Sequence, residues 1–91
     1  MIQYKPLAHP EVELAVVVTE VNDVPASVKI YLKSRTIIST PLTYITSNAL
    51  EQEILSRAGL PETYSLGTYA LVASASRGSM YFYTLSADVT T

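Results

Sequence analysis

His9 is the only histidine of this 91-residue chain, and it is the first residue to consider for chemistry. With one histidine and no cysteine, a single chain cannot supply a His/Cys zinc site, a thiolate nucleophile or a disulfide. A Ser-His-Asp arrangement would need His9 to meet a serine and either Asp23 or Asp88, yet no nucleophile-elbow sequence surrounds any serine. We therefore expect His9 to be a surface residue and not a catalytic base.

Two pairs of carboxylates have spacings that could support acid–base catalysis. Glu11 and Glu13 share one face of an expected strand, whereas Glu51 and Glu53 lie in the first turn of an expected helix. The first pair fits the solvated side of an edge strand, and the second fits helix capping and the helix dipole. Three scattered glycines cannot form a phosphate-binding loop or a dinucleotide fingerprint. The sequence predicts no catalytic residue, no metal site and no cofactor, and an enzyme ranks third among the functions considered.

One strand carries three cations and an aromatic residue at alternate positions. Lys29, Tyr31, Lys33 and Arg35 have a period of two, so we expect their side chains to share one face. Such a face could follow a phosphate backbone while the tyrosine stacks on a base. The net charge of −2 argues against a dedicated nucleic-acid binder, because that affinity depends on many cations. Since cations also guard sheet edges, nucleic-acid binding is the second interpretation of the sequence.

Tyrosine is abundant, with seven residues among ten serines and ten threonines. Its large apolar ring, polar tip and small loss of rotamer entropy are typical of protein interfaces. We expect a protein interface formed by Tyr4, Tyr69, Tyr81 and Tyr83. The alternation of the last strand places Tyr81 and Tyr83 on one face and Phe82 on the other. Because only one face can meet the helix, the second is expected to contact another subunit or sheet.

A helix from about Ala49 to Ala58 is the clearest local structure that the sequence predicts. Leu50, Ile54 and Leu55 form one apolar stripe. Asn48 is the expected N-cap, with Glu51 reaching back as in a capping box. At the other end the residues Gly59, Leu60 and Pro61 predict a Schellman motif followed by a stop, with Arg57 near the negative end of the dipole.

Two hairpins flank this helix. The first is expected from strands over 11–21 and 26–34, joined by the turn residues Asn22 to Pro25. The apolar run of Val16, Val17 and Val18 predicts that the first strand is buried on both faces at its middle. Residues 36–39 extend the second strand or form a short one of their own, and Pro41 ends the run. The second hairpin is expected from strands over 68–75 and 80–87, with Gly78 in the turn and a loop over 62–67 before it.

These elements predict a single α+β domain over residues 1–91. Its order is ββαββ, in two layers, with a mostly antiparallel sheet and one helix packed on one face. Residues 1–10, with Pro6 and Pro10, are expected to form an extended arm that lies on the sheet edge or reaches a neighbouring molecule.

Composition limits the setting of the protein. A chain that is 48% hydrophobic can form one core, but its longest unbroken apolar run, residues 14–18, is too short to cross a membrane. The N-terminal residues lack the apolar region of a secretory signal, so we expect a soluble protein of the cytoplasm or a virion.

The sequence thus favours a non-enzymatic interaction or assembly module that contacts copies of itself or a partner protein. Exposed sheet edges, the N-terminal arm and the tyrosine-rich strands are its expected contact surfaces. The small size and the Ser, Thr and Tyr content suggest a structural or accessory protein of a virus or phage. A small nucleic-acid-binding module that uses Lys29, Tyr31, Lys33 and Arg35 is the alternative.

Overall fold

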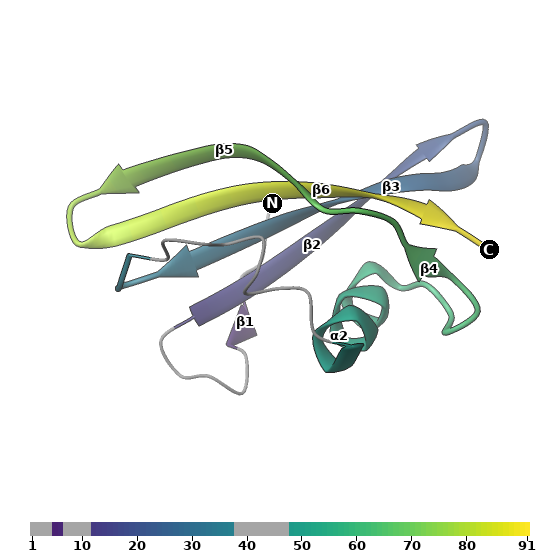
Figure 1. The fold of residues 1–91 in the computed structure, drawn as a ribbon, viewed down its shortest axis with the longest axis horizontal. Helices are drawn as coiled ribbons and strands as arrows, with labels where there is room; N and C mark the ends of the chain where they lie inside the picture. The colour runs from purple at the N-terminus through teal and green to yellow at the C-terminus, as the bar shows by residue number, and fades with distance from the viewer. Residues whose placement is uncertain (1–4, 7–11, 38–47) are drawn as a thin grey trace.

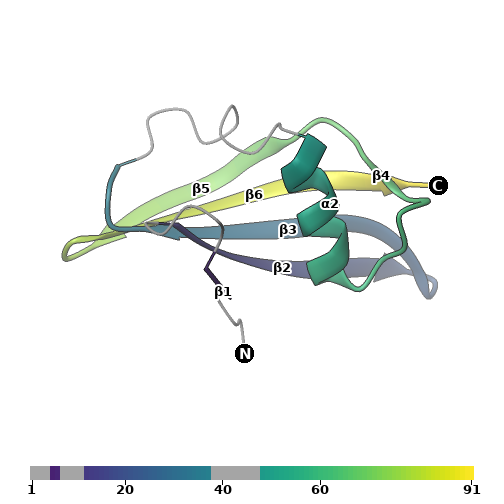
Figure 2. The ribbon, with the colours of Figure 1, turned by 90° about the horizontal axis from the view of Figure 1, so that it is seen from below.

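A computed structural model describes residues 5–6, 12–37 and 48–91. Within these ranges the chain forms an antiparallel sheet and one helix, α2 (Asn48–Ala58), which lies against one face of the sheet (Figures 1 and 2). The strands are β1 (Lys5–Pro6), β2 (Val12–Val21), β3 (Val24–Ser34), β4 (Ser65–Leu66), β5 (Ala70–Arg77) and β6 (Met80–Thr90). The predicted α+β class is confirmed, with one hairpin before the helix in the chain and one after it.

The two hairpins join through β3 and β6, which pair antiparallel along the middle of the sheet from Ser27–Asp88 to Ser34–Tyr81. β1 and β2 follow on the outer side of β3, while β4 and β5 both border the outer side of β6. Between β4 and β5 the Gly67 amide donates a 2.8 Å hydrogen bond to the Asp88 carbonyl. Residues 65–77 therefore follow β6 as one interrupted edge strand.

The core lies between α2 and the side chains that alternate toward it from the central strands. Val28, Ile30 and Leu32 of β3 have no exposed surface, and neither has Leu85, which faces Ile30 across the sheet. From the helix, Ile54 belongs to the same apolar cluster and is equally buried. The other buried hydrophobic residues in the described part of the chain are Val12, Leu14, Ala15, Leu55, Tyr83, Ala87 and Val89.

The first hairpin turns more tightly than the sequence suggested. Asn22 and Asp23 alone form the loop, with φ angles of 53° and 64°, as a two-residue type I′ turn requires. The predicted turn through Pro25 and strand start at Ala26 are therefore wrong, since β3 already begins at Val24. Pro25 is tolerated in the strand because it pairs with Glu20 at a register shift, where ladder hydrogen bonding is interrupted.

The second hairpin also closes with a two-residue turn. Gly78 and Ser79 separate β5 from β6, and Gly78 adopts a φ of 62° that an L-residue would find strained. β5 begins at Ala70, two residues after the predicted start, and both strands end beyond the predicted limits, β5 at Arg77 and β6 at Thr90. The expected loop over 62–67 contains β4, because its last residues reach the far end of β6.

Two further expectations about strands need correction. The middle of β2 is not buried on both faces: Val17 is 41% exposed, because it faces away from the helix. β3 ends at Ser34 and does not continue through residue 37. There the buried Ser34 hydroxyl accepts a 3.1 Å bond from the Thr36 amide and donates a 2.8 Å bond to the Thr36 carbonyl. This local turn replaces the ladder, and residues 38–41 lie outside the described part of the chain.

The predicted end of α2 is confirmed in detail. Gly59 takes a φ of 76°, and its amide donates a 3.1 Å hydrogen bond to the Ser56 carbonyl. The Leu60 amide donates a 2.9 Å bond to the Leu55 carbonyl, which completes a Schellman motif. Pro61 follows directly, so the chain cannot continue as a helix.

Glu51 in the first turns of α2 has a partner that the sequence did not reveal. Its carboxylate oxygen Oε1 accepts a 3.0 Å hydrogen bond from the Leu66 amide of β4. This tertiary contact ties the helix to the edge of the sheet, whereas the capping-box contact expected between Glu51 and Asn48 stays a prediction. The side chains of Asn48 and Leu50 lie outside the described part of the structure.

The N-terminal arm meets the sheet through β1, where Lys5 pairs with Leu14 and Pro6 with Glu13. The rest of the arm, including Tyr4 and His9, lies outside the described residues, and so does Glu11, the expected start of the first strand. Across the described ranges, no helix has the length and apolar character needed for a membrane span.

Candidate interaction surfaces

β5 is the most exposed element of the fold. All eight of its residues, from Ala70 to Arg77, are exposed, including Leu71 at 44% and Val72 at 57%. Within the described part of the chain, β6 is its only strand partner. One edge of β5 therefore presents main-chain N–H and C=O groups that no described strand satisfies, and such an edge is a template for strand pairing.

The exposure of β5 follows from the position of α2. The helix packs on β2 and on the core of the central strands, while the β5–β6 hairpin extends away from it (Figure 1). Ser74 and Ser76 face the helix side of the sheet, as their partners Tyr83 and Tyr81 do, but they lie beyond the cover that the helix provides. β5 is thus exposed on both faces.

The chemistry of β5 does not protect its edge. No charged residue and no proline occurs between Glu62 and Arg77, and residues 70–76 are only alanine, leucine, valine and serine. The opposite edge of the sheet is different. There β1 covers part of β2, Pro6 interrupts pairing, and a register shift next to the exposed Glu20 disturbs the strand. Natural sheets use these devices to prevent edge-to-edge association. Of them β5 has only a register shift against β6 between Leu71 and Ala73, and it carries no charge or proline before Arg77.

The tyrosines predicted as interface residues have different environments. Tyr83 is only 7% exposed and belongs to the core cluster, so its ring packs inside the molecule and offers almost no surface to a partner. Tyr81 and Tyr69 are half-buried and pack against the same cluster. The predicted alternation along β6 is confirmed by its register, which places Tyr81 and Tyr83 on the helix side. Tyr4 lies outside the described residues.

Tyr69 lies near the helix as well as the core. Burial raises the pKa of its hydroxyl above the ordinary value of 10.0, and the nearby Glu51 carboxylate raises it further. Both effects disfavour the phenolate, the first by removing water and the second by repulsion. Tyr69 thus lies at the junction between α2 and the β4–β5 edge.

The predicted basic stripe lies on the sheet face opposite α2, which we call the open face. Lys29, Tyr31 and Lys33 alternate with the buried residues of β3, as predicted, and Lys29 is exposed while the other two are half-buried. Lys33 forms an ion pair with Glu13 of β2, with 3.6 Å between Nζ and Oε2. Arg35 is exposed but follows the end of β3, so strand alternation does not fix its direction.

The fold adds residues to this face that lie far from the stripe in sequence. Phe82 of β6 is directly opposite Lys33, and Thr84 is directly opposite Tyr31. Tyr31 and Phe82 are therefore diagonal neighbours, about 7–8 Å apart, a distance that aromatic side chains can bridge. On its other side Phe82 faces the small, exposed Ala75 of β5. Sequence alternation placed Phe82 on this face, but only the β3–β6 register brings it beside Lys33.

Charges are distributed unequally between the two sides of the sheet. Arg77 is the last residue of β5 and lies opposite Met80, the first residue of β6. Arg35, which follows the last residue of β3, is near the same end of β6, because Ser34 pairs with Tyr81. On the helix side, Glu51, Glu53 and Glu62 outnumber Arg57 among the described charged residues of α2 and the loop that follows. Arg57 is engaged structurally, because its Nη1 donates a 2.7 Å hydrogen bond to the Leu14 carbonyl and its Nε donates one of 2.7 Å to Glu53.

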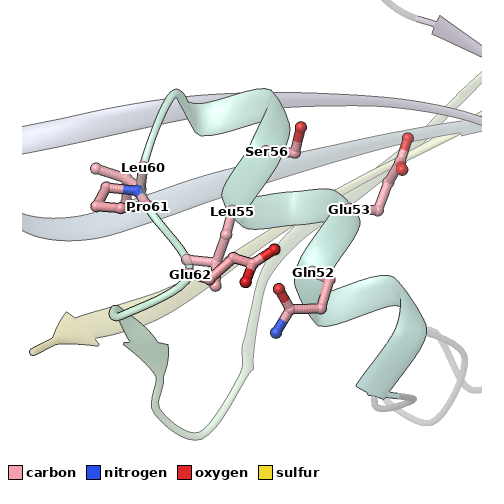
Figure 3. A pocket seen from close by; sticks show the side chains of 7 residues that line it. All are labelled: Gln52, Glu53, Leu55, Ser56, Leu60, Pro61 and Glu62. Carbon is pink, nitrogen blue, oxygen red and sulfur yellow. The ribbon is translucent and has the colours of Figure 1, made fainter.

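A shallow groove of about 470 Å³ runs beside the C-terminal half of α2 (Figure 3). It is lined by Gln52, Glu53, Leu55, Ser56, Leu60, Pro61 and Glu62. The groove is open to solvent, and its polar side chains come from the exposed side of the helix and the following loop. We assign no ligand to it.

Groups that could perform chemistry do not converge in the described structure. Within residues 5–6, 12–37 and 48–91, no three His, Asp or Glu side chains lie close enough to hold a metal ion. Asp23 is in the first hairpin turn, whereas Asp88 is on β6 beside Ser27 of β3. The distinctive surfaces of the described chain are therefore the β5 edge and the open face.

Comparison with known proteins adds no relative to this description. Neither the protein-family models, the curated proteins nor the solved structures contain a match to this chain.

Proposed function

We propose that this protein is a non-enzymatic assembly module whose β5 edge pairs with β5 of a second copy of the same chain. The observation that carries the proposal is the fully exposed edge strand beside β6, which is uncharged over residues 70–76. Pairing would satisfy its free main-chain groups and cover the exposed Leu71 and Val72. We further propose a small structural or accessory protein of a virus or phage, in the cytoplasm or the virion.

A second copy suits this edge better than an unrelated partner. In an antiparallel pair related by a two-fold axis at Ala73, each residue of 70–76 meets another alanine, leucine, valine or serine. No charge within this stretch would select a partner of opposite charge. Each copy carries a net charge of −2, and pairing through the uncharged residues 70–76 keeps the acidic residues of the two copies away from the contact.

Light scattering coupled to size-exclusion chromatography tests this proposal over a wide range of protein concentration. We expect the native chain to form a dimer, and the Val72→Lys variant to dissociate at least roughly tenfold more readily, because two like charges would meet in the paired edge. Val24→Lys is the matched control, since Val24 is 60% exposed against 57% for Val72 and lies near the first hairpin turn, outside β5. A chain that is monomeric at every concentration, or a Val72→Lys variant that associates like Val24→Lys, would contradict the proposal.

A further inference from the structure

We infer that the open face of the sheet binds single-stranded nucleic acid. This inference does not depend on self-association, and its surface shares with β5 only Arg77, the last residue of that strand. Its residues are those that point away from the core in the central strands, together with the cations at the end of the sheet: Lys29, Tyr31, Lys33, Phe82, Arg35 and Arg77.

The first argument is the placement of charge. Four of the six Lys and Arg residues of the chain lie on the open face or at its end, although the whole chain is acidic. Among the described residues two carboxylates also lie there: Glu13 pairs with Lys33, and Asp88 lies opposite Ser27 toward the far end of β3. The cations are therefore concentrated at the end that includes Phe82, where a polyanion would find the most favourable potential.

The second argument is the aromatic pair. Tyr31 and Phe82 stand on adjacent central strands as diagonal neighbours, and both are half-buried with part of the side chain accessible. Phe82 has the small Ala75 on its β5 side, which leaves room for a planar group over the ring. Two rings beside lysines on a sheet face are the combination that stacks successive bases while cations contact the phosphates.

Single strands suit this face better than duplexes. A sheet face with aromatic residues recognises unstacked bases, which a duplex does not present. Few cations are available, so stacking must supply part of the affinity. An acidic protein segment could meet the cations but would gain little from the rings. The salt dependence and the polymer preference of binding therefore separate these ligands.

Fluorescence anisotropy of the full chain with labelled oligo(dT) and oligo(U) tests the inference. We expect single-strand binding with a log–log salt slope of up to about −2.8 for four phosphate contacts, or roughly a 50-fold loss of affinity between about 50 and 200 mM salt. The double variant Lys29→Gln/Arg77→Gln should lower the slope by about 1.4, and Tyr31→Leu or Phe82→Leu should weaken binding at least about fivefold. Thermal unfolding of each variant shows whether the fold is retained.

Gln52→Glu/Thr63→Glu is the matched control, because it makes the same change of two charge units at exposed positions on the helix side. It should leave binding close to that of the native chain. Absence of binding at low salt would overturn the inference, as would an equal loss in the control or an unchanged Lys29→Gln/Arg77→Gln variant. Equal affinity for a duplex, or for poly-glutamate, would assign the open face to another class of ligand.

Discussion

Arg57 joins the helix to the sheet through its guanidinium group. The side chain is 14% exposed, contacts Glu53 one turn earlier, and donates a 2.7 Å hydrogen bond to the main-chain carbonyl of Leu14. A charged donor to a partly buried carbonyl contributes more than a surface ion pair does. Arg57 therefore has a structural role that its position near the helix C-terminus did not suggest.

We expect Arg57→Met to lower the free energy of unfolding by roughly 1.5–3 kcal/mol, because the methionine keeps much of the apolar stem but loses the bond to Leu14. Glu53→Gln should lower the free energy of unfolding by less than about 1 kcal/mol, since it weakens only the partly exposed ion pair with Arg57. Urea unfolding of both variants measures the difference. Equal losses would show that the ion pair, and not the contact to the sheet, stabilises the helix.

Tyr69 should make stability depend on pH in the alkaline range. Its pKa is raised in the folded chain by burial and by Glu51, so the folded state holds the proton more tightly than the unfolded state does. Its contribution to stability is then fully present below the unfolded pKa of about 10 and is lost as pH rises through the higher folded pKa.

Tyr69→Phe removes this ionisable group and should reduce the decrease in unfolding free energy between about pH 8 and pH 11. Urea titrations at both pH values measure it, with Tyr31→Phe on the open face as the control for loss of a hydroxyl group. A Tyr69→Phe variant with the same alkaline slope as the native chain would contradict the assignment.

Among the elements, α2 has the most completely specified end. Gly59 supplies the positive φ of 76° that closes the Schellman motif, and a methyl group at this position would meet no heavy atom within 4 Å. Any penalty for a side chain here therefore comes from backbone strain and not from a clash.

We expect Gly59→Ala to lower the unfolding free energy by about 1 kcal/mol, and Gly59→Asn to lower it less, because asparagine tolerates the left-handed region better than alanine. Denaturant unfolding of the pair measures this order. If alanine were tolerated as well as asparagine, backbone strain at Gly59 would not be the determinant of stability.

For the whole molecule, the proposed assembly and the open face have compatible geometries. Antiparallel pairing of two β5 strands places the two-fold axis perpendicular to the sheet, so the open faces of both copies lie on the same side. A dimer would thus present one continuous sheet with two basic and aromatic areas, while the helices lie together on the opposite side.

Hydrogen exchange provides a test at this scale. In dilute solution, amides of the central pair β3 and β6 should exchange slowest, and the amides of β5 that do not bond β6 should exchange fast. On concentration, these β5 amides should become protected, while amides at the β2 edge should change little. Concentration-dependent protection at β2 instead of β5 would show that the chain associates through the β2 edge and would contradict the proposal.

Much of the local structure was predictable. The order of strands and helix, the stop at Gly59 and the alternation of β3 and β6 depend on short-range patterns of apolar, polar and turn residues. The candidate surfaces were predictable only in part. Lys29, Tyr31 and Lys33 could be grouped because they share one strand, whereas the exposed edge of β5 shows in the sequence only as an uncharged stretch.

The sequence by itself determined which segments fold as strands and helix, because backbone preferences and side-chain periodicity act over a few residues. Only the tertiary structure decided that β3 and β6 lie at the centre, that Tyr83 is buried, that Glu51 binds β4, and that Phe82 stands beside Lys33. Each of these depends on contacts between residues distant in sequence. Such contacts are chosen by the shared core and by strand register, which no local pattern encodes.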